Sequence, residues 1–451
     1  MPYISKHLPN TLMLSLLISP ISNQISIDFY KCLAFKKFPP IRLKMWIKAL
    51  GLLVLVSGSF ALKGYKILEI SPKSEQESAI VAKLSSTYDF LKLTRSDTSQ
   101  VLVSPVEESR LRLVLAANKI AHKVVNNDVF ADVLKDKEDN EIFCVKSRLG
   151  TDCYRSHEEI NNYIEDLQSR FPSRVHVRHV GYSYERRDLK TILITNGDGV
   201  KNKKVIFVDA GMHAREWISP STGLYVIQQL VENFEENKHL LEKYDWVVMP
   251  MINADGYEFT RSSPDNRMWR KTRQPYEDCI GVDPNRNSGF MFGYAGTSDN
   301  PCVDTFKGPY PFSEPEVAVL RDVLLSLKGR IDFYLTLHSH GAYIIYPWGY
   351  DYIDAPNVDE LETVAQAGFN AIFKHSGRRY KVGNSAKLMY PAAGASDDYA
   401  YAEAGARISY TMELPSGGSR GFDPPPSDIK SYVEESWAGI SAMAEKVIEL
   451  Y

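Results

Sequence analysis

Residues 204–217 read KVIFVDAGMHAREW, an apolar run that changes abruptly to polar residues. The first half is β-branched and aromatic without polar alternation, which is typical of a central strand buried on both faces. Its polar end predicts functional side chains at the carboxyl end of that strand, where the binding sites of α/β sheets gather. The stretch therefore indicates a buried sheet with a site at one edge.

Similar strands alternate with helical stretches from about residue 155 to the end of the chain. Amphipathic stretches between the strands cover residues 221–237 and 314–331. Alternation of this kind predicts one large α/β domain, in which a mixed twisted sheet is flanked by helices. The other clear strands are residues 191–196 (TILITN), 246–253 (WVVMPMIN), 332–339 (DFYLTLHS) and 406–414 (ARISYTMEL).

A small α/β module precedes this domain, beginning at residue 62. Residues 64–70 and 99–106 read as strands, whereas residues 74–88 and 108–122 have helical spacing, the first after a Ser cap. We expect this module, which extends to about residue 140, to fold as a small α/β sandwich.

The two parts are joined by residues 136–152, DKEDNEIFCVKSRLGTD, which mix charges with loop residues. This composition predicts an exposed linker that a protease can reach. Lys146 and Arg148 offer cleavage points for a trypsin-like protease, and Lys137 and Arg155 are alternatives.

The amino-terminal segment has the layout of a secretory signal. Residues 45–61, MWIKALGLLVLVSGSFA, have a start-like Met45, a lysine, a short apolar run and a small-x-small ending. The apolar run is too short to span a bilayer comfortably, which disfavours the alternative of a membrane anchor. Residues 1–44 fit poorly before a signal, and we expect them to be an upstream extension of the gene prediction. The mature protein is therefore expected to be secreted.

Net charge and cysteine content indicate which classes of partner to expect and in which redox compartment the protein works. The net charge is −3 and no basic block stands out, so nucleic acid is not an expected partner. Of five cysteines, Cys32 lies in the leader, which leaves an even number in an oxidising compartment. Cys279 and Cys302 lie in a loop-rich stretch of the kind that a disulfide can staple. No Cys-x-x-Cys spacing occurs, which disfavours a zinc site made of thiols.

Two strand ends carry residues suited to a metal. His213 and Glu216 lie three positions apart, so both side chains can face one point. Alone, this pair is a weak signal, because ordinary ion pairing produces many such pairs. His338 ends a second buried strand, and two His with one Glu complete the ligand set of a catalytic zinc. The alternative for His338 is a hydrogen-bonded histidine of the core.

Two further charged residues stand in unusual places. Glu413 ends a third strand before a Pro/Gly loop, where an unpartnered carboxylate is costly to bury. It suits a base beside the metal, and the alternative is a strand-end salt bridge. Arg286 lies between asparagines in the tight loop VDPNRN, where its guanidinium suits a bidentate grip on a carboxylate.

Six motifs, in this order, resemble those of the pancreatic-type zinc carboxypeptidases of the A/B subfamily: HAREW, NRMWRKTR, GVDPNRN, LHSHG, MYPAAGASDDYAY and SYTMELP. The resemblance extends from about Gly64 to the end, because the front module resembles the inhibitory propeptide of that family. After a leader of residues 1–61, it implies a propeptide with its activation linker over residues 62–146 and a catalytic domain over residues 147–451.

The resemblance also implies roles for single residues. Glu413 would be the general base for a water that the metal activates, and Arg270 would stabilise the oxyanion at the last peptide carbonyl. Asp283 would accept a hydrogen bond from a zinc ligand. The implied ligands of one zinc ion are His213, Glu216 and His338. The implied substrate contacts are Arg215, Asn285, Arg286, Ser339, His340 and Tyr390, and the implied disulfide joins Cys279 to Cys302.

Three residues depart from the pattern of the family. His340 stands where Tyr is usual, Ser288 where an aromatic residue is common, and Pro415 where Arg is frequent. None of them replaces an implied metal ligand or the implied base, so they indicate altered subsites in an active enzyme.

The acidic pair Asp397–Asp398 lies among small, apolar and aromatic residues. Its local pattern suits a helix start, because Ser-Asp-Asp before an apolar run can cap backbone N–H groups. When the chain is aligned with the family on Tyr390 and Glu413, Asp397 falls at the base of the pocket for the terminal side chain. B-type relatives carry Asp there and A-type relatives an apolar residue, so the resemblance implies a preference for terminal Lys or Arg. Asp398 keeps a structural role.

The sequence thus predicts a secreted, monomeric zymogen that is activated by a trypsin-like protease and hydrolyses the last bond of peptide or protein C-termini. Neither nucleic acid nor a membrane is an expected partner. The alternatives are an A-type carboxypeptidase, a non-catalytic peptide-binding relative, and a zinc amidohydrolase acting on small acylated amino acids. The intact set of implied site residues argues against the second, and the third does not explain the propeptide.

Overall fold

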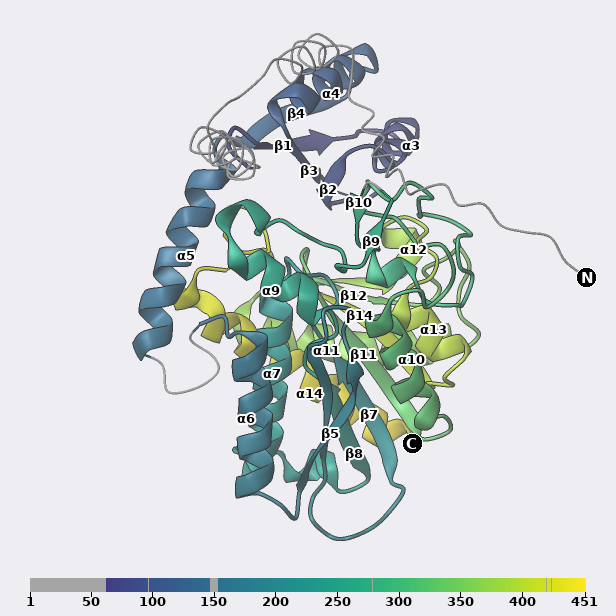
Figure 1. The fold of residues 1–451 in the computed structure, drawn as a ribbon. Helices are drawn as coiled ribbons and strands as arrows, with labels where there is room; N and C mark the ends of the chain where they lie inside the picture. Colours follow the sequence, from purple (N-terminus) through teal and green to yellow (C-terminus); the bar gives the residue numbers. More distant parts are fainter. Residues whose placement is uncertain (1–61, 96, 147–152, 278, 419, 423) are drawn as a thin grey trace, which may run out of the picture. The chain divides into compact units, whose positions relative to one another are not determined.

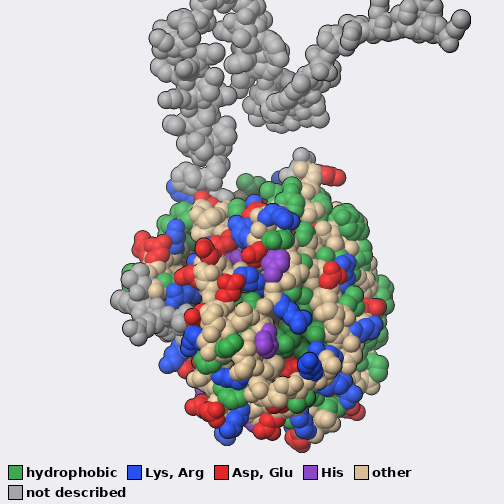
Figure 2. All heavy atoms as spheres, turned by 60° about the horizontal axis from the view of Figure 1, so that its bottom comes forward, with side chains coloured by type: hydrophobic (Ala, Val, Ile, Leu, Met, Phe, Trp, Pro, Cys, Tyr) green, Lys and Arg blue, Asp and Glu red, His purple; other side chains and the backbone are tan. Residues whose placement is uncertain are grey.

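The computed structural model describes residues 62–451 apart from residues 96, 147–152, 278, 419 and 423. The predicted signal peptide and the extension before it lie outside the described residues. Within the described part of the chain, no helix is both long and apolar enough to cross a membrane. Figure 2 shows acidic and basic side chains interspersed over the face in view, in keeping with the small net charge.

The front module is a four-stranded antiparallel sheet in the order β2-β3-β1-β4, with two helices packed on it. Leu68 and Val101 of the sheet join Val81 and Leu111 of the helices in one apolar cluster. The sequence patterns found the two central strands and missed the two edge strands, which have only one buried residue each. The elements are β1 (Lys66–Ser71), α3 (Glu75–Leu84), β2 (Asp89–Lys92), β3 (Ser99–Val103), α4 (Pro105–Ala117) and β4 (Ala121–Asn126).

The predicted exposed linker is wrong as far as residue 146, because helix α5 (Val129–Lys146) covers that stretch. Val129 and Val133, one turn apart, bury their side chains against Phe422 of the large domain. Further along the helix, Asn140 is also buried. Several charged residues are exposed on this helix and gave the stretch its linker-like composition, namely Lys135, Lys137, Glu138 and Glu141. Residues 147–152, which include Arg148, lie outside the described residues.

The large domain contains an eight-stranded mixed sheet in the order β13-β12-β14-β11-β7-β8-β6-β5. Its four central strands, β14, β11, β7 and β8, run parallel. The fold class that the sequence predicted is confirmed. The strands are β5 (Val175–Tyr182), β6 (Asp188–Ile194), β7 (Lys204–Asp209), β8 (Tyr244–Met249), β11 (Ile331–Ser339), β12 (Tyr343–Tyr346), β13 (Lys381–Asn384) and β14 (Ile408–Leu414), with a small ribbon of β9 (Pro275–Tyr276) and β10 (Cys279–Ile280).

Helices flank this sheet, and α14 packs against both α7 and α11 (Figure 1). Helix α10 contacts the sheet through β5, and α13 contacts it through β11 and β14. The helices are α6 (His157–Arg170), α7 (Ile218–Val231), α8 (Phe234–Asn237), α9 (Ala254–Ser262), α10 (Pro315–Ser326), α11 (Val358–Ser376), α12 (Ser385–Leu388), α13 (Ser396–Ala402) and α14 (Pro426–Leu450), with short 3-10 turns η1 (Lys238–Leu241), η2 (Pro264–Asn266) and η3 (Pro284–Arg286).

Two features of this domain place its site. The parallel pairing of β11 with β14 sets His338 directly opposite Glu413. The disulfide between Cys279 and Cys302, implied by the resemblance, is present and closes the loop region beside η3. The carboxyl ends of the central strands and the loops beyond them therefore meet at one edge of the sheet.

Candidate active site

Three potential metal ligands converge at this edge. His213 and Glu216 lie between β7 and α7, and His338 lies near the end of β11. Their ligand atoms lie within 4.8 Å of one another, and all three side chains are buried. His338 Nδ1 lies 3.1 Å from both His213 Nδ1 and Glu216 Oε2. Two imidazole nitrogens and a carboxylate oxygen are the donor set of a catalytic zinc, so the cluster could hold one such ion.

A buried carboxylate orients the first of these histidines. Asp283 Oδ1 accepts a hydrogen bond from His213 Nε2 over 3.0 Å. This bond leaves Nδ1 with its lone pair toward the other two ligands, as a metal ligand requires. Burial alone would raise the pKa of Asp283, but Arg270, Arg286 and His213 hold it well below its usual range. The carboxylate therefore stays charged and keeps the ring in this orientation.

Arg270 is fixed by the same carboxylate. Its Nε and Nη2 donate to Asp283 Oδ2 over 3.2 and 2.8 Å. Its Nη1 lies 3.2 Å from His213 Nδ1, at the edge of the ligand cluster. A guanidinium cation is thus held rigidly beside the position where a metal and a reacting carbonyl would meet.

Glu413 lies on β14, opposite His338 in the sheet. It faces a cavity of about 450 Å³ that also contains His213, Glu216 and Arg270 in its lining. Burial and the neighbouring Glu216 raise the pKa of Glu413 to about 8. Because its side chain lines the cavity, Glu413 could exchange a proton with a water there.

The same cavity unites most of the predicted substrate residues, which come from several loops. Arg286 is anchored to its loop, because its Nε donates to Gly296 O over 3.0 Å. The amide oxygen of Asn285 accepts the Ser396 N–H over 2.9 Å, which leaves the amide nitrogen as a donor. The predicted substrate residues in the lining are Asn285, Arg286, Ser339, His340, Tyr390 and Asp397.

The two aspartates of the acidic pair have separate environments. Asp398 does not cap its own helix; it accepts hydrogen bonds from the backbone N–H groups of Gly349 and Tyr350. Asp397 lines the cavity and is 2% exposed, and its Oδ2 has no hydrogen-bond partner among the described residues. Burial raises the pKa of Asp397. An ammonium or guanidinium group entering the cavity would supply the positive charge that this carboxylate lacks.

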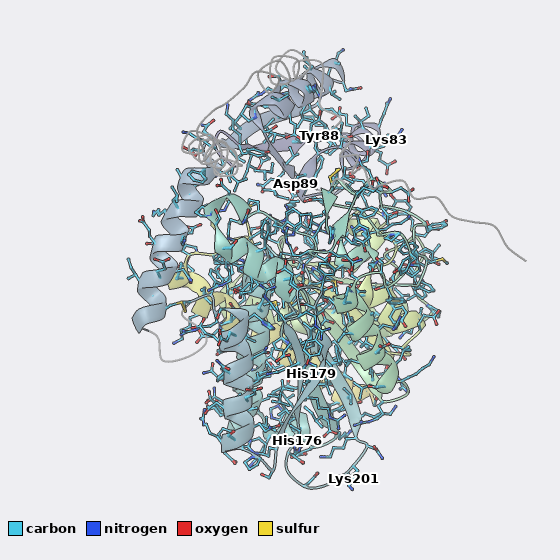
Figure 3. All side chains as sticks on the ribbon, in the orientation of Figure 1. Lys83, Tyr88, Asp89, His176, His179 and Lys201 are labelled. Carbon is cyan, nitrogen blue, oxygen red and sulfur yellow. A yellow bond between two sulfur atoms is a disulfide. The ribbon has the colours of Figure 1, made fainter. Side chains whose placement is uncertain are left out.

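Arg215 is the predicted substrate residue that the structure places elsewhere. It is buried and absent from the cavity lining, and its Nη1 lies 3.0 Å from both carboxylate oxygens of Asp89 in β2. Asp304 Oδ2 accepts from the same nitrogen over 3.3 Å. Figure 3 labels Asp89 on the front module. Neither acid was predicted from the sequence, because β2 was not recognised and both acids lie far from Arg215 in the chain.

The front module also contacts the cavity directly. Phe90 and Leu91 contribute to the cavity lining. Tyr390 donates its hydroxyl to Ser78 O over 3.1 Å, and Thr94 donates to Leu388 O over 3.5 Å. The module therefore covers the cavity and engages one of the predicted substrate residues.

The chain belongs to the zinc carboxypeptidase family, since residues 160–439 match that family. Residues 68–135 match the carboxypeptidase activation peptide, which identifies the front module. The protein is thus a metallocarboxypeptidase of the zymogen type, with a His-Glu-His cluster that could bind one metal ion.

Relatives of both specificity types are similar to it. It is 40% identical to a carboxypeptidase B of Astacus astacus over 301 residues, which cover 66% of this chain and 98% of the relative. It is 31% identical to zinc carboxypeptidase A 1 of Anopheles gambiae over 417 residues, which cover 89% and 95% of the two chains. The crystal structure of carboxypeptidase A from Helicoverpa armigera superimposes with a TM-score of 0.81 at 29% identity, covering 86% of this chain and 98% of that chain.

The contact between Asp89 and Arg215 is expected to make the uncut chain sensitive to pH. Burial raises the pKa of Asp89 to about 8, and Asp304 adds to the effect while Arg215 opposes it. An unfolded aspartate titrates near pH 4, so its stabilising contribution is present in full below that pH and is lost as the pH rises toward 8.

The thermal midpoint of the uncut wild type should therefore fall relative to that of Asp89→Asn between about pH 5 and pH 8. The control is Asp97→Asn, because the pKa of Asp97 is lowered in the fold and its linkage lies at more acidic pH. A difference between wild type and Asp89→Asn that stays constant over this range would contradict the assignment.

Proposed function

We propose that this chain is the secreted zymogen of a carboxypeptidase that removes single residues from peptide C-termini and prefers Lys or Arg. The carrying observation is the cavity itself, which is lined by members of the potential metal cluster, by Glu413 and by the buried acid Asp397. A trypsin-like protease would activate the enzyme by cutting in or near residues 136–155, after which the activation peptide no longer has to cover the cavity.

The chemistry would be shared between the metal and two residues of the chain. When bound by His213, Glu216 and His338, zinc supplies a Lewis acid for the scissile carbonyl and lowers the pKa of water. Glu413 would take the proton from the attacking water and deliver it to the amine that leaves. Arg270, held by Asp283, would donate hydrogen bonds to the oxyanion that develops on the carbonyl oxygen.

Restriction to the end of a peptide would come from a second group of residues. Arg286, Asn285 and Tyr390 line the cavity and offer a guanidinium, an amide and a phenol. Together these donors suit the free carboxylate of a terminal residue. An internal residue has no such carboxylate and would not be held in this way. Tyr390 donates to Ser78 of the activation peptide in the uncut chain, so activation would release it for substrate.

The preference for Lys or Arg rests on Asp397. Its carboxylate is buried with one oxygen lacking a hydrogen-bond partner, in a cavity that Ala392, Ala395 and Met389 also line. The aliphatic stem of Lys or Arg would pack on such walls while its charge meets the acid. An apolar terminal residue would instead leave the carboxylate buried without a counter-charge, which is costly.

Asp397→Ile is expected to reverse this preference in the cut enzyme. The ratio of kcat/KM for terminal Arg over terminal Leu should fall by about 10²–10³-fold, because a buried charge pair is replaced by apolar contact. Matched peptides that differ in the last residue alone provide the measurement. Glu403→Gln removes an exposed acid just beyond the same helix and should leave the ratio unchanged. A wild type that prefers Leu or Phe over Arg would assign the chain to the A type.

A further inference from the structure

A disulfide bond joins the activation helix to the segment that leads into the large domain. It links Cys144, in the last turn of α5, to Cys153, shortly before α6. Both cysteines lie between the two family segments, since the activation peptide match ends at residue 135 and the zinc carboxypeptidase match begins at residue 160. The cross-link is therefore a feature that neither matched segment contains.

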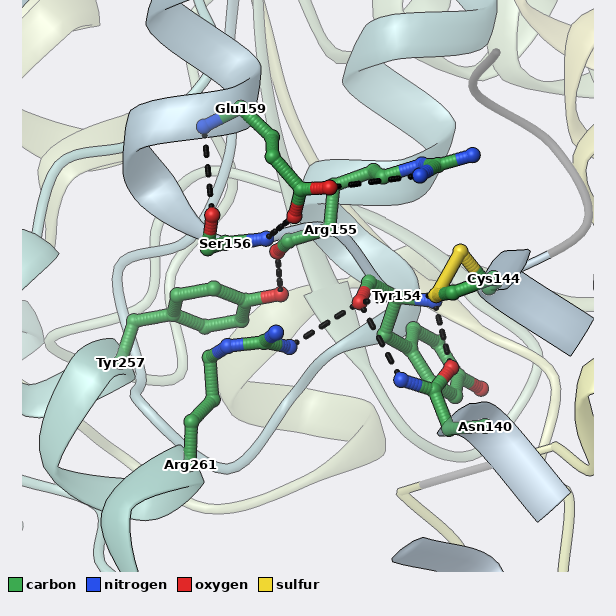
Figure 4. The surroundings of a disulfide bond; sticks show 9 residues. Asn140, Cys144, Tyr154, Arg155, Ser156, Glu159, Tyr257 and Arg261 are labelled. Carbon is green, nitrogen blue, oxygen red and sulfur yellow. Dashed lines mark hydrogen bonds and ion pairs between the residues drawn. A yellow bond between two sulfur atoms is a disulfide. The ribbon is translucent and has the colours of Figure 1, made fainter. Parts of the chain in front are cut away.

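The end of α5 is docked on the large domain by several further contacts. The side chain of Asn140 accepts from Tyr154 N over 2.8 Å and donates to Tyr154 O over 3.3 Å (Figure 4). Arg261 of α9 donates to the same carbonyl over 3.0 Å. One turn earlier, Asp136 forms an ion pair with the buried Arg420. The carboxyl-terminal half of α5 is thus attached to the catalytic domain beyond the disulfide itself.

The disulfide encloses the two best cleavage points of the sequence. Lys146 and Arg148 both lie between Cys144 and Cys153. The bond after Arg155, beyond the second cysteine, is held on both sides: Arg155 O accepts from the Tyr257 hydroxyl over 2.6 Å, and Ser156 N donates to Glu159 over 2.7 Å (Figure 4). With the bond after Arg155 held in this way, Lys146 and Arg148 remain the cleavage points that the sequence favours, and both lie between the cysteines.

We propose that activation cleavage yields a two-chain enzyme in which the activation peptide stays covalently tethered through Cys144 and Cys153. The inference rests on the proposed zymogen activation of this chain. Hydrolysis of a single peptide bond between the cysteines leaves the S–S bond untouched, so the cut frees a chain end without releasing the peptide. Release requires a second cut before Cys144, and the nearest basic residues on that side are Lys137 and Lys135, which are exposed on α5.

The tether has a kinetic consequence. A covalently linked inhibitor acts at an effective concentration set by its linker, on the order of millimolar for a short one, whatever the enzyme concentration. An activation peptide that is not covalently attached dissociates from the enzyme on dilution. The first cut therefore yields an enzyme whose activation peptide still competes for the cavity, and the second cut completes activation.

The covalent arrangement can be tested without any activity measurement. The full chain is cut briefly with trypsin, and the products are separated under denaturing conditions with and without reductant. We expect one species at the mobility of the uncut chain without reductant and two fragments with it, whose new amino terminus lies between the cysteines. Two separate fragments without reductant would place the first cut outside the cysteine pair and overturn the proposal, whether or not the enzyme is active.

A dilution series tests the consequence for activity. Lys135→Gln/Lys137→Gln blocks the second cut, and Cys144→Ser/Cys153→Ser in the same background removes the tether. After the first cut, the specific activity of the tethered protein should be independent of concentration, whereas that of the untethered protein should rise by about tenfold or more on dilution. Where the serine variant does not fold, the tethered protein alone decides, because a rise on dilution overturns the proposal.

Discussion

Glu413→Gln is expected to lower kcat for peptide hydrolysis by about 10²–10⁴-fold in the cut enzyme. The substitution keeps the size of the side chain and removes its ability to accept a proton from water. Peptide binding should persist, since the proposed carboxylate grip of Arg286, Asn285 and Tyr390 is intact. Steady-state kinetics with a peptide ending in Arg, together with calorimetric binding of the same peptide, measure both effects.

Bound metal provides the control for this variant. Glu413 is not one of the three ligands, so the variant should still hold one zinc ion per chain when measured by elemental analysis. Loss of the metal would mean that Glu413 supports the ligand cluster, and unchanged turnover would refute its role as base. A non-catalytic peptide-binding relative would show no change in any of these quantities.

Arg270→Ala is expected to lower kcat by about 10²–10³-fold with little change in KM, as the loss of one oxyanion donor does elsewhere. The oxyanion exists in the transition state and not in the bound substrate, so the loss should fall on kcat. Arg273→Ala is the matched control: it lies in the same basic run, stacks on Phe259 at 3.5 Å and does not line the cavity. A rise in KM with kcat unchanged would instead assign Arg270 to substrate binding.

Removal of Arg270 also takes away one of the two partners of Asp283, which could weaken metal binding. This change must be distinguished from the loss of the oxyanion donor. Asp283 contacts both Arg270 and His213, so Asp283→Asn should weaken metal retention more than Arg270→Ala does. Metal content after dialysis at equal zinc activity distinguishes the two variants.

The central strands and the three potential ligands could be predicted because the relevant signal is local. Each ligand lies at or just beyond the end of a continuous apolar strand, and parallel strands bring such ends to one edge. A structural role for Asp398 could be predicted, but its hydrogen-bond partners could not. Its actual partners, Gly349 and Tyr350, lie in a loop whose position depends on the packing of the whole domain.

Contacts between the activation peptide and the large domain could not be predicted from local patterns. Asp89 and Asp304 meet at Arg215 although each lies far from it in sequence. Helix α5 was missed because its few buried residues serve an interface and its charged residues dominate the composition. The sequence shows Cys144 and Cys153 on either side of Lys146, but it did not tell which cysteine each of them pairs with.

The pairing of His338 with Glu413 across β11 and β14 makes the site sensitive to the length of these strands. Side chains at the same register in adjacent parallel strands point to the same face, about 4.8 Å apart. A single residue inserted into or deleted from β14 before Glu413 would turn that carboxylate to the opposite face of the sheet. These two strands should therefore tolerate changes of residue type far better than insertions or deletions, which the loops around them can absorb.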